Sequence, residues 1–506
     1  MRRITSIRLA ATAAGCAAAL AVVVPGAAQA SYFESSYSGI CTNADTLNGL
    51  GASTQRSVML DGWGATLGAP SPGGPNALGF GYDAGADYAN CGVFKTAADG
   101  GSKAINYRAT GSGSCTDVVG AKNSTDPRNY NDGTTTVSNV AFCGTDDPPT
   151  EQQIGWAEQG PPTHSTDGQL LTIPVAQVAL APVVRLPDGC QVADQSKRQL
   201  TRDQANLAFE GVTSTWGDVF GTNITAEAGS GLTSADCRAK VFVRVVRFDS
   251  SGSTFIFKRY LQAASHATGG DSFDWRDPTE GGTLANNAWP SGATSVVTAG
   301  VNGAGAQLDT LSAQSANGGI GYSDVATDRA KGYGWDYTGS AYVANDRTLW
   351  LRAQRISNDS FVSPAVTNAQ VASGANAGAN CLNVAYSNQV TSSNLGASWF
   401  PATAVPTPTD FPICGLTYQL AWLWGLDPQH SFGKVQTGST EGEWRAARDF
   451  LKYELGIIRP GVGPSKLAPL GYAKLPSDVL ATAQAEANKV GWIRATTDPL
   501  PGDPIS

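Results

Sequence analysis

The chain has 506 residues, of which 41% are hydrophobic and 15% are charged, so it is long enough to bury a large core. Its content of Gly (59 residues) and Pro (27 residues) is lower than that of disordered or collagen-like chains. The formal net charge of −8 argues against nucleic-acid binding, which needs a clustered basic surface.

Residues 1–30 have the organisation of a secretory signal peptide. Three arginines precede an apolar stretch from Leu9 to Val24, and the small-residue motif Ala-Gln-Ala ends at Ala30. We expect cleavage after Ala30, which removes three positive charges and takes the net charge from −8 to −11. A lipoprotein signal ending at Cys16 is the alternative. No later apolar run reaches the roughly 18 residues of a membrane span.

The mature chain carries eight cysteines, and an even number in an exported protein predicts disulfides. Sequential pairing is the simplest of many connectivities and gives Cys41–Cys91, Cys115–Cys143, Cys190–Cys237 and Cys381–Cys414. No CxxC motif is present, and the three histidines are scattered at His164, His266 and His430. We therefore expect no metal site and no cofactor.

Five segments predict secondary structure, and they alternate between strand and helix. The range 201–210 opens with a capping box, and 240–248 is a β-branched run typical of a strand buried on both faces. Helical spacing of apolar residues follows at 253–264, 440–455 and 478–490. This alternation predicts an α/β fold.

Two further segments differ from these in composition. Residues 64–103 are rich in Gly, Ala and Pro, and residues 357–410 are polar, small and rich in Pro. We expect the first to be an extended surface excursion and the second to be an insertion.

The motifs of common enzyme classes are missing from the sequence. It contains no G-x-S-x-G, P-loop, HExxH or G-x-G-x-x-G pattern, and none of the histidines sits beside a catalytic motif. A dispersed Ser-His-Asp triad stays open at this point, because its members can lie far apart in sequence.

Four segments combine hydroxyl groups with glycines in a way that suits an anion. Their backbone N–H groups lie near expected helix N-termini, where aligned donors face an oxyanion. Ser/Gly-rich turns also occur with no ligand, so one such segment alone says little. The four are GLGAST (49–54), YRATGSGS (107–114), FCGTDDP (142–148) and RFDSSGST (247–254).

Together and in this order, the segments resemble the periplasmic phosphate-binding proteins of phosphate ABC transporters. The most specific match is the R-x-D-x-S-G-[ST] turn at 247–253 with GGIGY downstream at 318–322. The other matching segments are NGLGAST (48–54), INYRATGSGS (105–114), FCGTDDPPTEQQ (142–153), LTRDQANLAFEGVTSTWGD (200–218), FPICGLTYQL (411–420) and LGYAKLPSDVL (470–480).

The resemblance implies a two-lobed periplasmic-binding-protein fold of type II-like architecture. Each lobe has a central sheet flanked by helices, and the ligand lies in the interlobe cleft. The expected division is a signal peptide at 1–30, a discontinuous lobe I at 31–180 plus 411–506, lobe II at 181–335, and an extended insertion or return segment at 336–410.

The resemblance also implies the ligand-binding residues. In such a site Arg247 gives charge-assisted hydrogen bonds, Asp146 accepts one from the phosphate, and Asp249 orients and partly neutralises Arg247. Ser53 takes the place of a Thr, and Thr54 stands where the family has Phe and is expected to donate its backbone N–H. The full expected set is Ser53, Thr54, Ser112, Asp146, Arg247, Ser251, Gly252 and Ser253, with Asp249 in support and no catalytic residue.

The departures from the family are local. The first loop reads GLGAST rather than GAGATF, Asp147-Pro-Pro replaces a more usual Ala-Pro-Leu, and the chain is longer at 64–103 and 357–410. The expected function is therefore capture of inorganic phosphate outside the cytoplasm and delivery to ABC permease subunits, by a monomer that is not an enzyme. The alternatives are binding of another tetrahedral oxyanion, hydrolysis of phosphate esters, or an adhesion or signalling role on the same scaffold.

Overall fold

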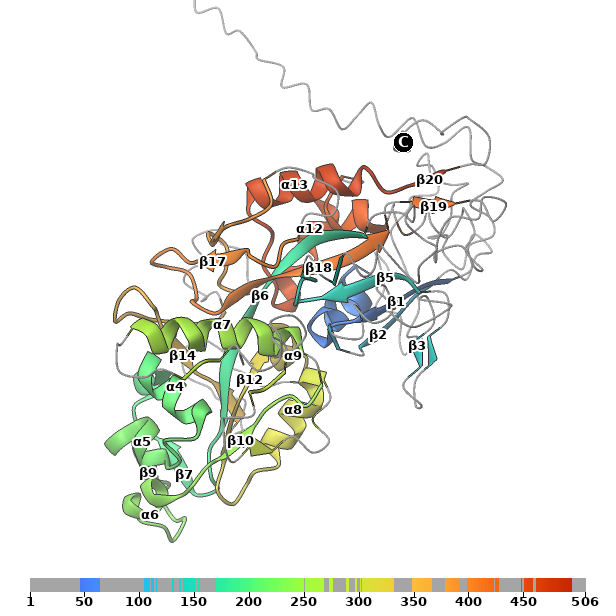
Figure 1. Ribbon diagram of the computed structural model, residues 1–506. Coiled ribbons are helices and arrows are strands. Elements are labelled where there is room, and N and C mark those ends of the chain that lie inside the picture. The colour runs from blue at the N-terminus through green and yellow to red at the C-terminus, as the bar shows by residue number, and fades with distance from the viewer. Residues whose placement is uncertain are drawn as a thin grey trace, which may run out of the picture.

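A mixed sheet organises the described part of the chain (Figure 1). The computed structural model describes residues 46–63, 104–109, 111–112, 115, 130–131, 136–137, 140–150, 153–154, 170–249, 251–267, 273–275, 288–290, 296–297, 301, 303–331, 348–365, 378–391, 398–422, 424–426, 447, 450–457 and 461–493. The signal peptide, Cys41–Cys91 and the 64–103 segment lie outside these residues.

The nine strands of this sheet follow the order β11-β10-β12-β6-β18-β5-β1-β2, and β13 pairs with β6 beside that path. Their bounds are Val296–Val297, Val243–Val245, Gly319–Asp324, Leu170–Arg185, Cys414–Trp422, Val140–Thr145, Thr46–Gly51, Ala104–Ala109 and, for β13, Thr348–Trp350.

Strand β6 joins two sets of parallel strands. Its first ten residues pair with β18, which pairs antiparallel with β5, and β5, β1 and β2 are mutually parallel. Its last six residues pair antiparallel with β12, and β12, β10 and β11 are mutually parallel. Figure 1 shows β6 running between the two groups of elements. Its side chains are buried except at its end, Arg185, so β6 forms the centre of the core.

The helices on the β12 side cover both faces of that part of the sheet. Phe209 of α4 packs against Phe257 of α7 with ring centroids 4.8 Å apart, and Phe257 stacks on Tyr322 of β12 at 4.6 Å. On this side the helices are α4 (Arg202–Glu210), α5 (Trp216–Phe220), α6 (Ser234–Ala239), α7 (Gly252–Ala267), α8 (Gly303–Ser312) and α9 (Val325–Ala330).

The β18 side is covered by α13 (Ser477–Ala487), which packs on β6. The short helices are the α-helix α12 (Val462–Ser465) and the π-helix η3 (Val58–Gly62). The 3-10 helices are η2 (Ser53–Gln55), η5 (Gln195–Lys197), η6 (Gly221–Asn223) and η9 (Ala468–Leu470). The short strands are β3 (Tyr130–Asn131), β4 (Thr136–Val137), β7 (Cys190–Val192), β8 (Gln199–Leu200), β9 (Ile224–Ala226), β14 (Arg352–Gln354), β15 (Phe361–Val362), β16 (Ala385–Ser387), β17 (Thr403–Val405), β19 (Trp424–Leu426) and β20 (Gly491–Ile493).

The predicted helices are found with small shifts at their ends. Thr201 caps α4 and accepts a hydrogen bond from the Gln204 N–H at 3.1 Å, as the capping box predicts. The predicted helices at 253–264 and 478–490 correspond to α7 and α13. Of the one predicted at 440–455, the described residues 447 and 450–454 are helical, and its first turn lies outside the described part.

The strand predicted at 240–248 is shorter in the structure. Only β10, at 243–245, pairs in the sheet, and it is parallel to both of its neighbours. Phe248 instead donates its N–H to the Val301 carbonyl at 3.1 Å, and Arg247 forms an ion pair with Asp249. The chain between β10 and α7 is therefore held by these contacts rather than by ladder pairing.

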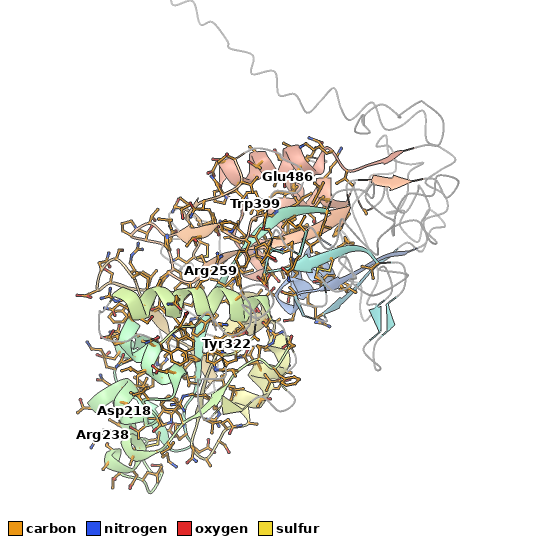
Figure 2. The ribbon with its side chains drawn as sticks, viewed as in Figure 1. Asp218, Arg238, Arg259, Tyr322, Trp399 and Glu486 are labelled. Carbon is orange, nitrogen blue, oxygen red and sulfur yellow. A yellow bond between two sulfur atoms is a disulfide. The ribbon has the colours of Figure 1, made fainter. Side chains whose placement is uncertain are left out.

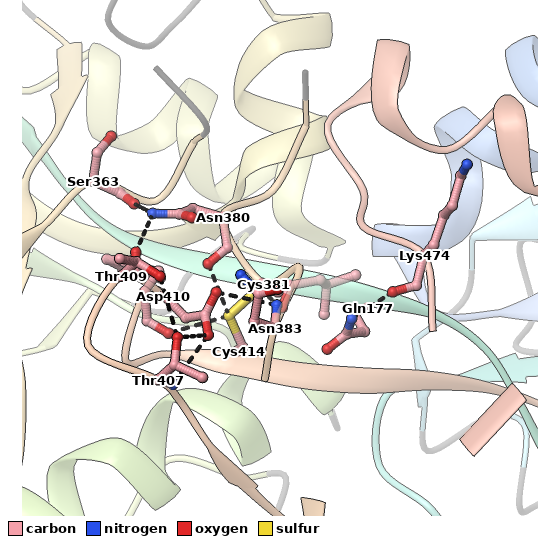
Figure 3. Close-up of a disulfide and its surroundings, with 12 residues drawn as sticks. Gln177, Ser363, Asn380, Cys381, Asn383, Thr407, Thr409, Asp410, Cys414 and Lys474 are labelled. Atoms are coloured by element: carbon pink, nitrogen blue, oxygen red, sulfur yellow. Dashed lines mark hydrogen bonds between the residues drawn. A yellow bond between two sulfur atoms is a disulfide. The ribbon is translucent and has the colours of Figure 1, made fainter. Parts of the chain in front are cut away.

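The segment predicted to be an insertion at 357–410 packs into the core where it is described. Trp399 and Val384 are buried, and Cys381 forms a disulfide with Cys414 of β18. Figure 3 shows the surrounding hydrogen bonds, in which the Asn380 amide donates to the carbonyls of Ser363 and Thr409, each at 3.1 Å. This segment is therefore tied to the central sheet, although its composition is that of a loop.

Three predicted disulfides are confirmed: Cys115–Cys143, Cys190–Cys237 and Cys381–Cys414. None of the described helices is both long and apolar enough to cross a membrane.

Candidate anion-binding site

The four segments expected to bind an anion follow the carboxyl ends of parallel strands. Ser53 follows β1, Ser112 follows β2, Asp146 follows β5, and Arg247 lies two residues after β10. The carboxyl ends of β1, β2 and β5 lie along one edge of their part of the sheet. Strand β10 runs in the opposite direction, so its carboxyl end faces theirs. Ligands bind at the carboxyl ends of parallel strands in open α/β folds. The topology thus brings together residues nearly 200 positions apart in sequence.

Arg247 is the buried cation of this site. It is 2% exposed, and its Nε donates to Asp249 Oδ1 at 2.6 Å while Nη2 pairs with Oδ2. Its Nη1 donates to Ser53 Oγ at 3.3 Å. The side-chain pairing of Asp249 with Arg247 is the one we expected. The Ser53 contact joins the end of β1 to the end of β10, across the two sets of parallel strands.

Asp146 is the buried acid of this site. Its backbone N–H donates to Ser112 Oγ at 3.2 Å, and its carboxylate accepts a hydrogen bond from the Thr54 hydroxyl. Burial raises the pKa of Asp146 to about 6, and the charge of Asp324 adds to this rise, while hydrogen bonds from Thr417 and Thr54 and the charge of Arg247 oppose it. The carboxyl group can therefore gain or lose a proton near neutral pH.

Thr54 has a contact that the sequence does not reveal. We expected a role for its backbone N–H, whereas the structure also engages its side chain with Asp146. A Phe at this position, as in the family, has no hydroxyl to donate. Thr54 thereby links the first loop to Asp146 in the third loop.

The Ser251-Gly252-Ser253 turn forms the start of α7. Ser251 Oγ accepts the Thr254 N–H at 3.4 Å, and Ser253 Oγ is buried with no hydrogen-bond partner among the described residues. A Cβ on Gly252 would lie 2.5 Å from the Asp146 Cβ and 2.6 Å from Ser112 Oγ. Only glycine fits here, so the N-terminus of this 16-residue helix directly contacts the second and third loops.

The N-terminus of α8 also belongs to this cluster, although the sequence analysis did not predict a role for this helix. The Ala304 N–H donates to Ser53 Oγ at 3.1 Å, and the Gly303 N–H donates to Asp249 Oδ1 at 3.3 Å. The only signal in the sequence is a pair of small residues after Asn302, which is too common to single out a site.

Tyr322 supports the segment between Arg247 and Thr254 through its hydroxyl group. Its hydroxyl lies 2.6 Å from Thr254 Oγ1 and 3.5 Å from the Arg247 backbone nitrogen, which donates to it. The GGIGY motif contains this tyrosine, but the sequence analysis assigned no role to it. Tyr322 is therefore a support for the Arg247–Thr254 segment rather than a member of the expected set.

The Cys115–Cys143 disulfide braces two of the loops. Cys115 lies three residues after Ser112 in sequence, and Cys143 lies in β5 three residues before Asp146. The bond links the second loop to β5, the strand that leads into the third loop, and the two Cα atoms are 5.4 Å apart.

The arrangement suits recognition of an oxyanion. One guanidinium, several hydroxyls and helix N-terminal N–H groups supply donors, and a single carboxyl group supplies an acceptor. In the part of the chain that the structure describes, no group of three or more His, Cys, Asp or Glu residues is placed to hold a metal. His164 and His430, which were considered for a triad, lie outside the described residues.

The fold and the donor-rich site define an α/β protein of the periplasmic-binding-protein class. The family model for the PBP superfamily domain matches residues 39–377, and the chain belongs to this superfamily. No curated protein matches the sequence.

Solved structures of phosphate-binding proteins share the fold. A high-affinity periplasmic phosphate-binding protein called PfluDING, bound with phosphate, is 17% identical with a TM-score of 0.54, and the match covers 91% of this chain and 99% of that one. A human phosphate binding apolipoprotein is 18% identical with a TM-score of 0.51, covering 90% and 99%. A phosphate-binding protein from Stenotrophomonas maltophilia is 15% identical with a TM-score of 0.50, covering 87% and 93%.

Proposed function

We propose that this protein captures inorganic phosphate outside the cytoplasm and delivers it to the permease of an ABC transporter. The observation that carries the proposal is the buried Arg247, which is surrounded by hydroxyl and N–H donors and lies in the same cluster as the protonatable acid Asp146. Phosphate offers oxygens to the donors and, near neutral pH, a proton to the acid. The phosphate-binding proteins of similar fold support this assignment.

The proposed ligand set is Ser53, Thr54, Ser112, Asp146, Arg247, Ser251, Gly252 and Ser253, supported by Asp249. We propose that these residues close on the phosphate from two lobes, one built on 31–180 and 411–506 and the other on 181–335. The boundary after residue 180 falls within β6, so this strand serves as a connection between the lobes. The segment 336–410 is proposed to return the chain to lobe I.

We propose that the protein acts as a monomeric carrier without covalent chemistry. A signal peptide at 1–30 directs its export, and the permease subunits are its protein partners. Its net charge of −11 after cleavage does not oppose binding, because exposed charges are screened beyond about 8 Å at physiological salt and the ligand interacts with the buried donors.

Replacement of Arg247 tests the proposal. Arg247→Ala removes a charge-assisted pair of hydrogen bonds and leaves Asp249 without its partner, so phosphate binding should weaken by roughly 2–5 kcal/mol in isothermal titration. Arg238→Ala, on α6 at the far end of the structure, is the matched control and should bind as wild type (Figure 2). Phosphate binding by Arg247→Ala within threefold of wild type would show that the site has been assigned to the wrong residues.

A further inference from the structure

A cavity of about 290 Å³ lies between α7 and the chain segment that enters β18. One wall is formed by Phe255, Ile256 and Tyr260 of α7, and the other by residues 402–406 and 412–416. Its volume is close to the lower end of the range for small-molecule sites, about 300–1000 Å³. Of the proposed phosphate ligands, Asp146 alone borders it, so the cavity is a neighbouring space rather than the phosphate site itself.

Two guanidinium groups line this cavity, whose other walls are mostly apolar apart from Asp146, Ser357 and Thr403. Arg259 lies on the face of α7 toward β17 and β18 (Figure 2), donates to the carbonyls of Phe400 and Ala402, and stacks over the Phe255 ring at 4.3 Å. Arg355 is 4% exposed and donates to the Asp410 carbonyl at 3.1 Å and to the carbonyls of Thr407 and Pro406. Backbone carbonyls therefore hold both cations in place.

Neither of these arginines has a carboxylate partner in the described part of the chain. Asp147 and Asp410 are the acids whose charge they feel, at longer range. The Asp410 carboxylate is turned toward Thr407 and the Asn383 N–H (Figure 3). Within the described residues, Arg355 Nε is buried without a hydrogen-bond partner. The cavity wall thus carries positive charge that no neighbouring carboxylate neutralises at contact distance.

We propose that this cavity binds a monocarboxylate with an unbranched apolar body, such as a medium-chain aliphatic acid. The aromatic and aliphatic wall removes the hydrocarbon from water, which favours binding through burial of apolar surface. Arg355 and Arg259 attract the carboxylate head group of this ligand. Burial of a charge without a partner is costly, so an anionic ligand relieves this cost.

Isothermal titration with decanoate, and with decanol as its uncharged counterpart, tests the proposal on the unaltered protein. We expect one equivalent of decanoate to bind at least tenfold more tightly than decanol. Equal binding of the two would mean that the arginines only hold the chain in place, and absence of decanoate binding would remove the site altogether. Either result overturns the proposal.

An obstructing variant places the ligand in this cavity. Ala263 of α7 lines the cavity and is exposed, so Ala263→Phe fills the mouth without overpacking the core. It should weaken decanoate binding at least tenfold, whereas Ala481→Phe, at an exposed position of α13, should leave it unchanged. Equal decanoate affinity in Ala263→Phe and wild type would also overturn the proposal. Phosphate titration of both variants verifies that they are folded, and it tests the phosphate site separately.

Discussion

At the scale of single residues, we expect Asp146 to distinguish phosphate from sulfate. A buried carboxylate accepts a hydrogen bond from protonated phosphate but repels fully ionised sulfate, and like charges brought together in this way cost several kcal/mol. Asp146→Asn should therefore keep some phosphate binding and gain measurable sulfate binding, because the amide supplies a donor in place of a negative charge.

Competition titration with sulfate measures this change in selectivity. Asp147→Asn is the control, because this neighbouring acid follows the same strand and lies outside the proposed ligand set. Loss of selectivity in Asp147→Asn alone would mean that the acceptor has been assigned one residue too early. Unchanged selectivity in both variants would place the discrimination against sulfate elsewhere.

Sequence patterns predict which loops meet at the site but not how their side chains pair. The Arg247–Asp249 contact is an exception, because it is local in the chain and the family resemblance implied it. The Ser53–Ala304 contact spans 251 positions and exists only because the topology brings β1 and α8 together. The Thr54–Asp146 contact depends on a departure from the family's own motif, so the family offered no precedent for it.

At the scale of elements, the Cys115–Cys143 disulfide should affect both stability and binding. The chain-entropy model assigns a loop of this length about 3–4 kcal/mol of unfolding free energy. Replacing both cysteines with Ala should lower the unfolding free energy by that order, measured by urea denaturation, and should weaken phosphate binding because the second and third loops lose their brace.

The Cys190–Cys237 bond provides the matched comparison. It joins β7 to α6, at the end of the structure away from the site (Figure 1), and closes a loop of similar size. Its double-Ala variant should lose comparable stability while binding phosphate as wild type. Equal loss of affinity in both variants would show that the Cys115–Cys143 bond has no specific role at the site. Peptide mapping would test the remaining predicted pair, Cys41–Cys91.

Elements with strong local signals were predictable, and elements determined by tertiary pairing were not. The capping box of α4 and the apolar spacing of α7 and α13 are local properties of the chain. Strand β6 contains Pro174 and Pro182, and proline argues against a central strand. In the structure Pro174 lies at the register shift opposite Tyr418, where the ladder tolerates it.

At the scale of the whole molecule, buried acids make stability fall as pH rises. Burial raises the pKa of Asp146 and Asp324 to about 6 and that of Glu486 to about 8, and it raises the pKa of Glu454 well above its ordinary value. Each acid binds its proton more tightly in the folded state, so its stabilising effect is complete below about pH 4 and is lost as pH passes the folded pKa.

The unfolding free energy should therefore decrease between pH 5 and pH 8, by more than about 1 kcal/mol, in urea denaturation without phosphate. Glu486→Gln keeps a neutral, isosteric side chain and should flatten the decrease between pH 6 and pH 8. A stability that rises over this range would contradict the raised pKa values of these acids in the folded protein.

The order in which the chain is synthesised determines when β6 can pair with its neighbours. Its ladder partner β18 follows it by more than 200 residues, as the pairing of Ala179 with Cys414 shows. This long, almost fully buried strand must therefore wait, with one edge unpaired, until most of the chain has been synthesised. Long-range pairing of this kind slows folding and prolongs exposure of an apolar strand. A chain truncated before residue 414 would keep both groups of parallel strands and still lack the strand that completes them.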